Sequence, residues 1–358
     1  MSAPALEFLI PGDLQAATGG YGYDRRMLAG LRELGWQVSV HALDASFPQP
    51  SRAALAHAAG VLERLPDQAL VLVDGLALGA MPAVVAAHAT RLHLLALVHH
   101  PLAAESGLPP DLQQSLAQSE RLALQSVRQV VVTSRATQLA LAHYGVEPAR
   151  VAVVEPGTQP APLAHGPPGD APELLCVATL TPRKGHDLLF AALAALLPQR
   201  WHLTCVGSLT RSPQTVARLR AQLRDHALEA RVTLAGEVAA DALERHYRAA
   251  SLFVLATRLE GYGMAVAEAL AHGLPVVSTR VGAIAALVAR AGLLVEPGDE
   301  PALRAALRRA LGEPGLLGQL AREAAVVRAS LSGWPQACAR LSQVLAATAP
   351  AAGAAAMR

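Results

Sequence analysis

Two glutamates stand on either side of a glycine-rich turn in the segment Glu260–Glu268, which reads Glu-Gly-Tyr-Gly-Met-Ala-Val-Ala-Glu. An apolar run precedes the turn and predicts a buried strand, and Met264–Ala271 consists of good helix formers. A helix start in this setting binds anions, because its N–H groups are unpaired and the helix dipole is positive there. We expect Glu260 in the turn and Glu268 about two helical turns further on. This spacing suits a ligand with a phosphate in its middle and hydroxyl groups at both ends.

Lys184 is the one lysine of the chain, whose 30 basic residues are otherwise all arginine. It lies in the loop Thr181–His186, which follows the apolar run Leu174–Ala178. A compact ammonium group at the end of a strand suits a diphosphate. The alternative is an ordinary solvated charge on a loop.

Gly19 and Gly20 lie between the first predicted strand and a helix predicted over Tyr23–Leu34. The spacing from Gly20 begins like the phosphate turn of a nicotinamide dehydrogenase, but Arg25 stands in place of the third glycine. The pattern therefore argues against that class of enzyme. We interpret the two glycines as a turn whose backbone comes close to a ligand bound mainly by another domain.

His99 and His100 end a predicted strand and are followed by Pro101. A histidine at such a place is able to hydrogen-bond a sugar hydroxyl group or to move a proton. The alternative is that neighbouring backbone groups satisfy both rings, and the sequence does not decide which of the two faces a ligand.

Short apolar runs alternate with helical patterns along the chain, which predicts an α/β fold with a doubly wound parallel sheet in each half. Ligands of this architecture bind at the carboxyl ends of the strands, so we expect two Rossmann-like domains facing each other across a cleft. The predicted strands of the first half are Leu6–Ile10, Gln37–Leu43, Leu70–Val73, Leu92–Val98, Gln129–Thr133 and Val151–Val154. Those of the second half are Leu174–Ala178, His202–Val206, Val232–Leu234, Leu252–Leu255, Pro275–Ser278 and Leu293–Val295.

Residues 159–170 contain four prolines and two glycines, which predicts a domain linker. We therefore expect an N-terminal domain over residues 1–163 and a second domain over residues 171–332. In residues 333–358 we expect a helix that returns to the first domain, followed by a frayed tail.

The composition excludes several classes of function. A net charge of +2 without a long basic cluster argues against binding of nucleic acid. No unbroken apolar run is long enough to span a membrane and no signal peptide opens the chain, so we expect a cytoplasmic protein. No group of His, Cys, Asp and Glu has metal-ligand spacing, and no metal site is expected. The three cysteines, Cys176, Cys205 and Cys338, are expected to be reduced core residues.

In their order and spacing these motifs resemble the retaining, nucleotide-sugar-dependent glycosyltransferases of family 4, which share the GT-B fold. The resemblance covers nearly the whole chain. It rests on the Gly19-Gly20 loop, the strand-end histidine and the segments 154–158, 182–185, 234–238, 260–268, 273–277 and 292–299.

The resemblance implies that residues 1–163 form the acceptor-side domain and residues 171–332 the donor-binding domain. It also implies a role for each residue of the donor site. Glu260 would lie against the donor sugar, and Glu268 would bind the ribose hydroxyl groups of the nucleotide. The backbone of residues 262–264, which are Tyr262, Gly263 and Met264, would contact the sugar and the phosphate. Lys184 would bind the diphosphate, His99 or His100 the transferred sugar, and the backbone of Gly20 would approach the diphosphate from the first domain.

Thr179 departs from the family pattern, because it stands five residues before Lys184, where an arginine is usual. A hydroxyl group cannot replace a bidentate guanidinium group on a phosphate. Arg183, next to Lys184, is the candidate to compensate.

The implied reaction moves a sugar from a UDP-, GDP- or other nucleoside diphosphate sugar to a hydroxyl group, with retention and without a metal or other cofactor. The acceptor is a glycan, a lipid or a small molecule, and a lipid would bring peripheral contact with a membrane. Variable loops of the first domain, 43–50 and 102–110 with Asp24 nearby, are expected to bind it. The alternatives are a non-catalytic sugar-nucleotide-binding protein, a GT-B-fold epimerase or phosphorylase, and a nicotinamide dehydrogenase.

Overall fold

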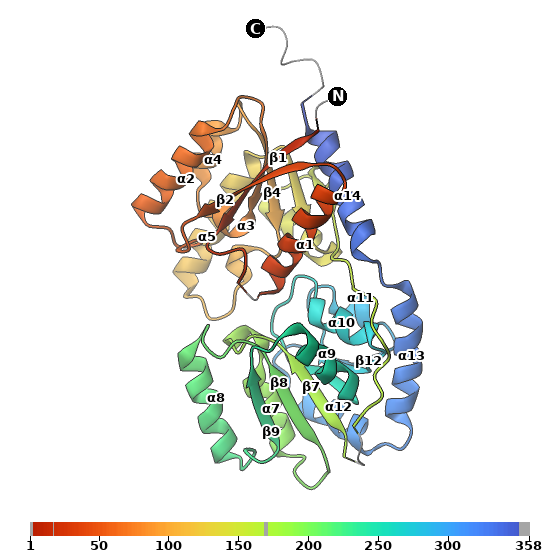
Figure 1. Ribbon diagram of the computed structural model, residues 1–358. Helices are drawn as coiled ribbons and strands as arrows, with labels where there is room; N and C mark the ends of the chain where they lie inside the picture. Colours follow the sequence, from red (N-terminus) through yellow and green to blue (C-terminus); the bar gives the residue numbers. More distant parts are fainter. Residues whose placement is uncertain (1–2, 17, 168–170, 351–358) are drawn as a thin grey trace. The chain divides into compact units, whose positions relative to one another are not determined.

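The computed structural model describes residues 3–16, 18–167 and 171–350 (Figure 1). The chain forms two compact units. Unit 1 contains residues 1–157 and 334–358, and unit 2 contains residues 158–333. None of the helices in the described ranges is long and apolar enough to cross a membrane.

Unit 1 is built on a parallel six-stranded sheet in the order β2-β1-β3-β4-β5-β6. Every residue of β3 and β4 is buried, as expected for central strands covered on both faces. The strands are β1 (Ala5–Pro11), β2 (Gln37–Leu43), β3 (Leu70–Asp74), β4 (His93–Val98), β5 (Gln129–Val132) and β6 (Val151–Val153). The α-helices are α1 (Gly19–Glu33), α2 (Arg52–Arg64), α3 (Gly75–Leu78), α4 (Pro82–His88), α5 (Pro110–Gln125), α6 (Arg135–Leu141) and α14 (Trp334–Thr348), with short 3-10 turns at η1 (Leu102–Ala104), η2 (Ala142–Tyr144) and η3 (Pro148–Arg150).

Unit 2 is built on a second parallel six-stranded sheet, in the order β12-β11-β10-β7-β8-β9. Its strands are β7 (Glu173–Val177), β8 (His202–Val206), β9 (Val232–Gly236), β10 (Leu252–Leu255), β11 (Val276–Thr279) and β12 (Gly292–Val295). The helices are η4 (Pro182–Lys184), α7 (His186–Ala194), α8 (Pro213–Asp225), α9 (Ala240–Ala249), α10 (Met264–Ala271), α11 (Ile284–Val288), α12 (Glu300–Gly312) and α13 (Leu316–Ser330).

These two sheets confirm the prediction of an α/β fold with two doubly wound, Rossmann-like domains. Each predicted strand corresponds to a strand of the structure within a residue or two at its ends. The success has a physical cause, because strands buried on both faces must be short continuous apolar runs.

The chain crosses between the units at residues 157–158 and 333–334, and the predicted boundaries lie at residues 163–171 and 332–333. Helix α14 belongs to unit 1, where the indole N–H of Trp36 donates to Ser342 Oγ over 2.9 Å. Of the predicted linker, residues 159–167 form neither helix nor strand, and residues 168–170 lie outside the described ranges. The predicted frayed tail also lies outside them from residue 351 onward.

The prediction for the first helix was wrong at its start, because α1 begins at Gly19 and not at Tyr23. Thr18 caps the helix: its Oγ accepts from the Tyr21 N–H over 3.2 Å, and its carbonyl oxygen accepts from Gly22 over 2.8 Å. A threonine cap outweighs the low helix propensity of glycine in the first turn. Gly19 and Gly20 are therefore the first residues of the helix and not a turn before it.

Candidate functional site

The loops that follow β7 and β10 carry the candidate site of unit 2. The two strands are neighbours and run parallel, so both loops leave the same edge of the sheet. Lys184, at the end of η4, donates a hydrogen bond to Oε1 of Glu260 in the loop before α10. The guanidinium Nη1 of Arg183 lies 3.9 Å from the same oxygen. The structure thus brings together three of the predicted site residues, with their side chains only 16%, 11% and 21% exposed.

Backbone contacts hold these two loops against each other. The backbone N–H of Arg258 donates to the carbonyl oxygen of Arg183 over 2.7 Å, and Nη1 of Arg183 donates to the carbonyl oxygen of Leu259 over 2.9 Å. Gly185 has φ +69°, and a Cβ at this position would collide with the carbonyl oxygen of Ala256. The position therefore requires glycine.

Arg258, in the loop after β10, also binds Asp187 in the first turn of α7. Neither residue was identified from the sequence. The guanidinium group of Arg258 binds the Asp187 carboxylate with two bonds of 2.9 and 2.7 Å. Burial alone would raise the pKa of Asp187, but the hydrogen bonds and positive charge of Arg258 lower it. No sequence signal links the two residues, because only the pairing of β7 with β10 brings their loops together.

Both helices that start at these loops are capped by glycine. Gly263, with φ +101°, forms the N-cap of α10, and Gly185 forms that of α7. In α7 the Asp187 carboxylate accepts from the backbone N–H groups of Asp187 and Leu188. A glycine cap brings no side-chain acceptor to α10, and the positive end of its dipole favours an anion there. The predicted span of α10 is confirmed. Tyr262 is buried with Ala267 and Ala283, and Met264 packs against this group, so the role predicted for residues 262–264 falls to their backbone.

Glu268 lies on α10, and its Oε2 accepts a hydrogen bond of 3.0 Å from the hydroxyl group of Tyr247 on α9. Tyr247 is buried, and its ring stacks on His272 at 4.8 Å between centroids. Burial and the neighbouring Glu268 carboxylate raise the pKa of Tyr247 well above its usual value, which keeps the hydroxyl group a donor. Sequence reasoning missed Tyr247, because its partner lies 21 residues away on another helix.

His99 forms the centre of a second cluster, in unit 1. A Cβ built on Gly20 would lie 3.4 Å from ring atoms of His99, so the first turn of α1 covers the imidazole. Nε2 of His99 lies 3.4 Å from Asp24 Oδ1 and 3.8 Å from Asp74 Oδ2. Both carboxylates are about 1% exposed, and neither Asp24 oxygen has a hydrogen-bond partner within the described ranges.

The charged groups of this cluster change the pKa values of His99 and Asp74. Burial alone would lower the pKa of His99, but the Asp24 carboxylate, and beyond it Asp74, raise it above the usual value. Burial and the nearby Asp24 raise the pKa of Asp74 to about 7. These carboxylates thus extend the imidazolium form of His99 to higher pH than burial alone would allow.

His100 occupies a different environment. Its Nε2 lies 3.6 Å from Glu105 Oε2, a side chain that is 40% exposed. The structure thus places His99, and not His100, beside Gly20 and the buried carboxylates.

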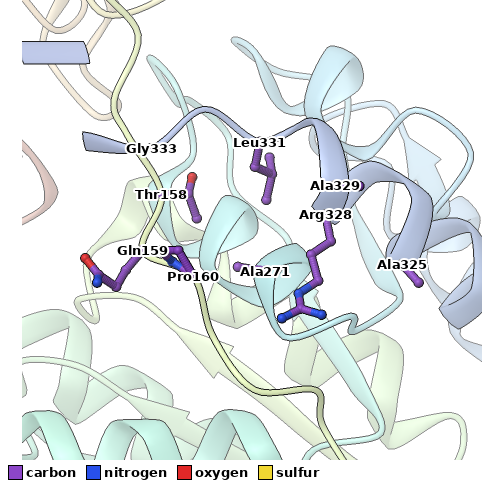
Figure 2. Close-up of a pocket in the computed structure, with 9 residues that line it drawn as sticks. All are labelled: Thr158, Gln159, Pro160, Ala271, Ala325, Arg328, Ala329, Leu331 and Gly333. Carbon is purple, nitrogen blue, oxygen red and sulfur yellow. The ribbon is translucent and has the colours of Figure 1, made fainter. Parts of the chain in front are cut away.

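A pocket of about 290 Å³ also opens in unit 2 (Figure 2). Thr158 to Pro160, Ala271 and the end of α13 with Arg328 line it, and the Thr158 N–H donates to Ser332 over 2.8 Å. The residues predicted from the sequence lie elsewhere. The pocket therefore lies where residues 158 and 332 of unit 2 pair, away from the loops that carry Lys184 and Glu260.

Residues 171–313 match the family model described as Glycosyl transferases group 1. The chain is 34% identical over 169 residues to mannosylfructose-phosphate synthase from Agrobacterium fabrum, which covers 45% of this chain and 37% of that protein. It is 31% identical over 252 residues to D-inositol 3-phosphate glycosyltransferase from Acidothermus cellulolyticus, with 65% and 56% covered. The chain thus spans less than two thirds of the length of either curated relative.

Among solved structures, sucrose-phosphate synthase from Thermosynechococcus elongatus is similar with a TM-score of 0.82 and 21% identity, over 96% of this chain and 98% of that one. The Anabaena protein HepE, solved in complex with UDP-glucose, is similar with a TM-score of 0.74 and 18% identity, over 96% and 99%. At these identities the likeness concerns the fold, and it confirms the predicted GT-B architecture.

Proposed function

The chain belongs to the group 1 glycosyltransferases, and we propose that it transfers a sugar from a nucleoside diphosphate sugar to an acceptor hydroxyl group. One observation carries this proposal: Lys184 and Glu260 form a largely buried pair beside the glycine-capped N-terminus of α10. A cation and the positive end of a helix dipole suit a diphosphate, and a carboxylate suits the hydroxyl groups of a sugar.

Each part of the donor has a partner in unit 2 under this proposal. Lys184 leaves Glu260 to bind the diphosphate, and Glu260 turns to the sugar. Glu268, held by Tyr247, accepts hydrogen bonds from the ribose. The likeness to HepE, which was solved with UDP-glucose, supports a nucleotide sugar as the donor. Positive charge from Lys184 and the helix starts would stabilise the leaving nucleoside diphosphate, so the transfer itself is proposed to need no metal.

In unit 1 we assign the sugar contact to His99. Its ring lies against Gly20 and carries a raised pKa, so it is able to donate a hydrogen bond to a sugar hydroxyl group. Retention of the anomeric configuration and membership of family 4 are part of the proposal. The acceptor is proposed to be a glycan, a lipid or a small molecule with a free hydroxyl group.

A panel of UDP- and GDP-sugars tests the donor first, because a bound ligand raises the melting temperature by mass action. The stabilising donor is then supplied with acceptor pools, and sugar transfer and donor hydrolysis are measured. Lys184→Ala and Glu260→Ala should each reduce transfer by at least about 100-fold, since each removes charge stabilisation from the reacting diphosphate or sugar.

Arg245→Ala is the matched control in the same unit, because Arg245 pairs with Asp241 on the exposed face of α9. It should leave transfer unchanged. A donor that binds without being transferred or hydrolysed would leave only a sugar-nucleotide-binding protein and overturn the proposal.

A further inference from the structure

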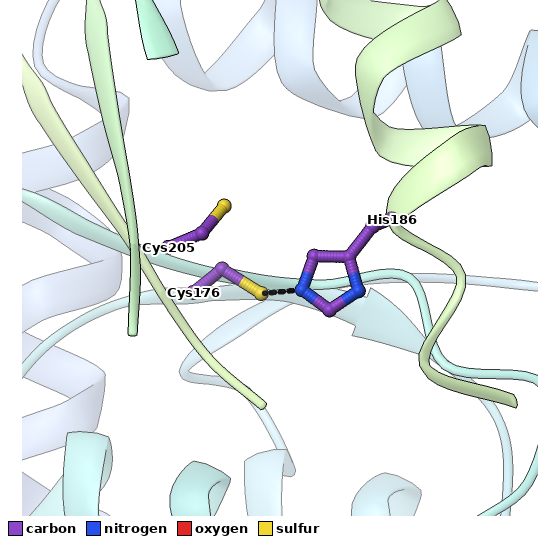
Figure 3. Close-up of side chains that lie close together, drawn as sticks. All are labelled: Cys176, His186 and Cys205. Carbon is purple, nitrogen blue, oxygen red and sulfur yellow. Dashed lines mark hydrogen bonds between the residues drawn. The ribbon is translucent and has the colours of Figure 1, made fainter. Parts of the chain in front are cut away.

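Cys176, Cys205 and His186 meet inside unit 2 (Figure 3). Cys176 on β7 and Cys205 on β8 are direct partners in the parallel register, so their side chains project from the same face of the sheet. His186 is the first residue of α7 and packs beside them. All three residues are at most 1% exposed. Far apart in the sequence, they had shown no metal-ligand spacing.

The three side chains form a compact set of soft donor atoms. One ligand atom from each residue lies within 4.8 Å of the other two, and His186 Nε2 is 3.7 Å from Cys176 Sγ. The other ring nitrogen, Nδ1, is buried without a hydrogen-bond partner within the described ranges.

We propose that Cys176, Cys205 and His186 form a binding site for one thiophilic d10 metal ion of the zinc class. Zinc bonds of about 2.3 Å to sulfur and 2.0 Å to nitrogen require ligand atoms roughly 3.3 to 4 Å apart, close to the spacing found here. Two thiolates, a neutral imidazole and a divalent ion sum to zero charge, which suits a buried place. Hard cations such as Mg²⁺ prefer oxygen ligands and do not fit this set.

Binding would replace the thiol protons of Cys176 and Cys205, which leave to solvent, by two metal–sulfur bonds. No electrons move in this step. His186 directly follows Lys184 and Gly185, so the ion would also fix the loop of Lys184 to strands β7 and β8.

Cadmium is the probe, because cadmium thiolates absorb in the ultraviolet by charge transfer. The full chain is first stripped of metal by a chelator under reducing conditions and then titrated with Cd²⁺. We expect a charge-transfer band that saturates at one ion per chain. Cys338→Ser is the matched control, since Cys338 is a buried cysteine of unit 1, and it should keep the band. Cys176→Ser and Cys205→Ser should each bind at least about 100-fold more weakly.

A second measurement stays interpretable if Cys176→Ser and Cys205→Ser do not fold. Zn²⁺ should raise the melting temperature of Cys338→Ser, in which the proposed site is intact. Absence of a saturable band in Cys338→Ser, in which all three proposed ligands are present, would refute the site. Neither readout depends on sugar transfer, so the outcome is separate from that of the proposed activity.

Discussion

Lys184 and Glu260 form an ion pair although 76 residues separate them in the sequence. Their side chains are 16% and 11% exposed, and Nη1 of Arg183 lies 3.9 Å from the same Glu260 oxygen. A diphosphate that binds Lys184 must therefore compete with Glu260. Part of the donor's binding energy therefore goes into separating the pair.

This competition predicts opposite effects of two substitutions on the binding of the nucleoside diphosphate product. Glu260→Gln should strengthen binding of UDP or GDP by roughly fivefold, because a pair worth about 1 kcal/mol no longer competes for Lys184. Transfer should nevertheless fall, because the sugar loses its carboxylate. Lys184→Met should weaken both nucleotide binding and transfer. Isothermal titration calorimetry measures the affinities, and weaker nucleotide binding by Glu260→Gln would contradict the competition.

Gly185→Ala should destabilise unit 2 by more than about 3 kcal/mol, because the new Cβ would collide with the carbonyl oxygen of Ala256. Gly315→Ala is the matched control. Gly315 lies in the same unit at φ +79°, close to the +69° of Gly185, and has open space around its Cβ position. It should cost only about 1 kcal/mol of left-handed strain. Urea denaturation measures the loss of stability in both variants. Equal losses would show that the left-handed strain, and not the collision with Ala256, destabilises Gly185→Ala.

The sequence sufficed for the sheets and for the turn and helix that carry Glu260 and Glu268. Apolar runs located the strands, and the glycine turn before α10 pointed to Glu260 and, through helical spacing, to Glu268. The sequence did not suffice for side-chain contacts that depend on which strands are neighbours in the sheet. The pairing of β7 with β8 joins Cys176 to Cys205, and that of β3 with β4 brings Asp74 near His99. Such contacts follow from strand order and register, which local patterns do not encode.

Tyr247→Phe should weaken donor binding and leave the maximal rate of transfer nearly unchanged. The hydroxyl group of Tyr247 orients the Glu268 carboxylate, the proposed ribose ligand, and does not belong to the reacting centre. We expect a rise of KM by about three- to tenfold, equivalent to about 0.6 to 1.4 kcal/mol, because Tyr247 orients Glu268 and does not itself contact the donor. The buried ring keeps its stacking on His272, so the fold should be retained. A loss confined to kcat would place Glu268 in the chemical step instead.

Glu120→Gln should stabilise the protein at pH 8 but not at pH 5. Glu120 is buried on α5, and burial raises its pKa from 4.5 to about 7. The folded state therefore holds more protons than the unfolded state between pH 4.5 and 7, and stability falls as the pH rises through this window. Glutamine stays neutral, and its carbonyl oxygen is able to keep the 2.9 Å bond from the Leu102 N–H.

The advantage of Glu120→Gln over the wild type should thus grow by up to about 3 kcal/mol from pH 5 to pH 8. Thermal and urea unfolding at several pH values provide the comparison. Glu313→Gln, at an exposed ion pair with Arg309, should lack this trend, because its pKa is lowered and it is ionised throughout the window. An advantage of Glu120→Gln that is the same at both pH values would contradict the assignment.

Asp24→Asn should shift the alkaline limb of the pH–rate profile for transfer to lower pH. The Asp24 carboxylate, 3.4 Å from His99 Nε2, counters the effect of burial and keeps the imidazolium form at higher pH. Without that charge His99 loses its proton earlier, and with it the proposed hydrogen bond to the sugar. Asp74→Asn should act in the same direction but less, because Asp74 lies farther away, at 3.8 Å. His100→Gln should leave the limb in place, since His100 faces Glu105. If the alkaline limb shifts in His100→Gln and not in Asp24→Asn, the proposed contact with the sugar belongs to His100 and not to His99.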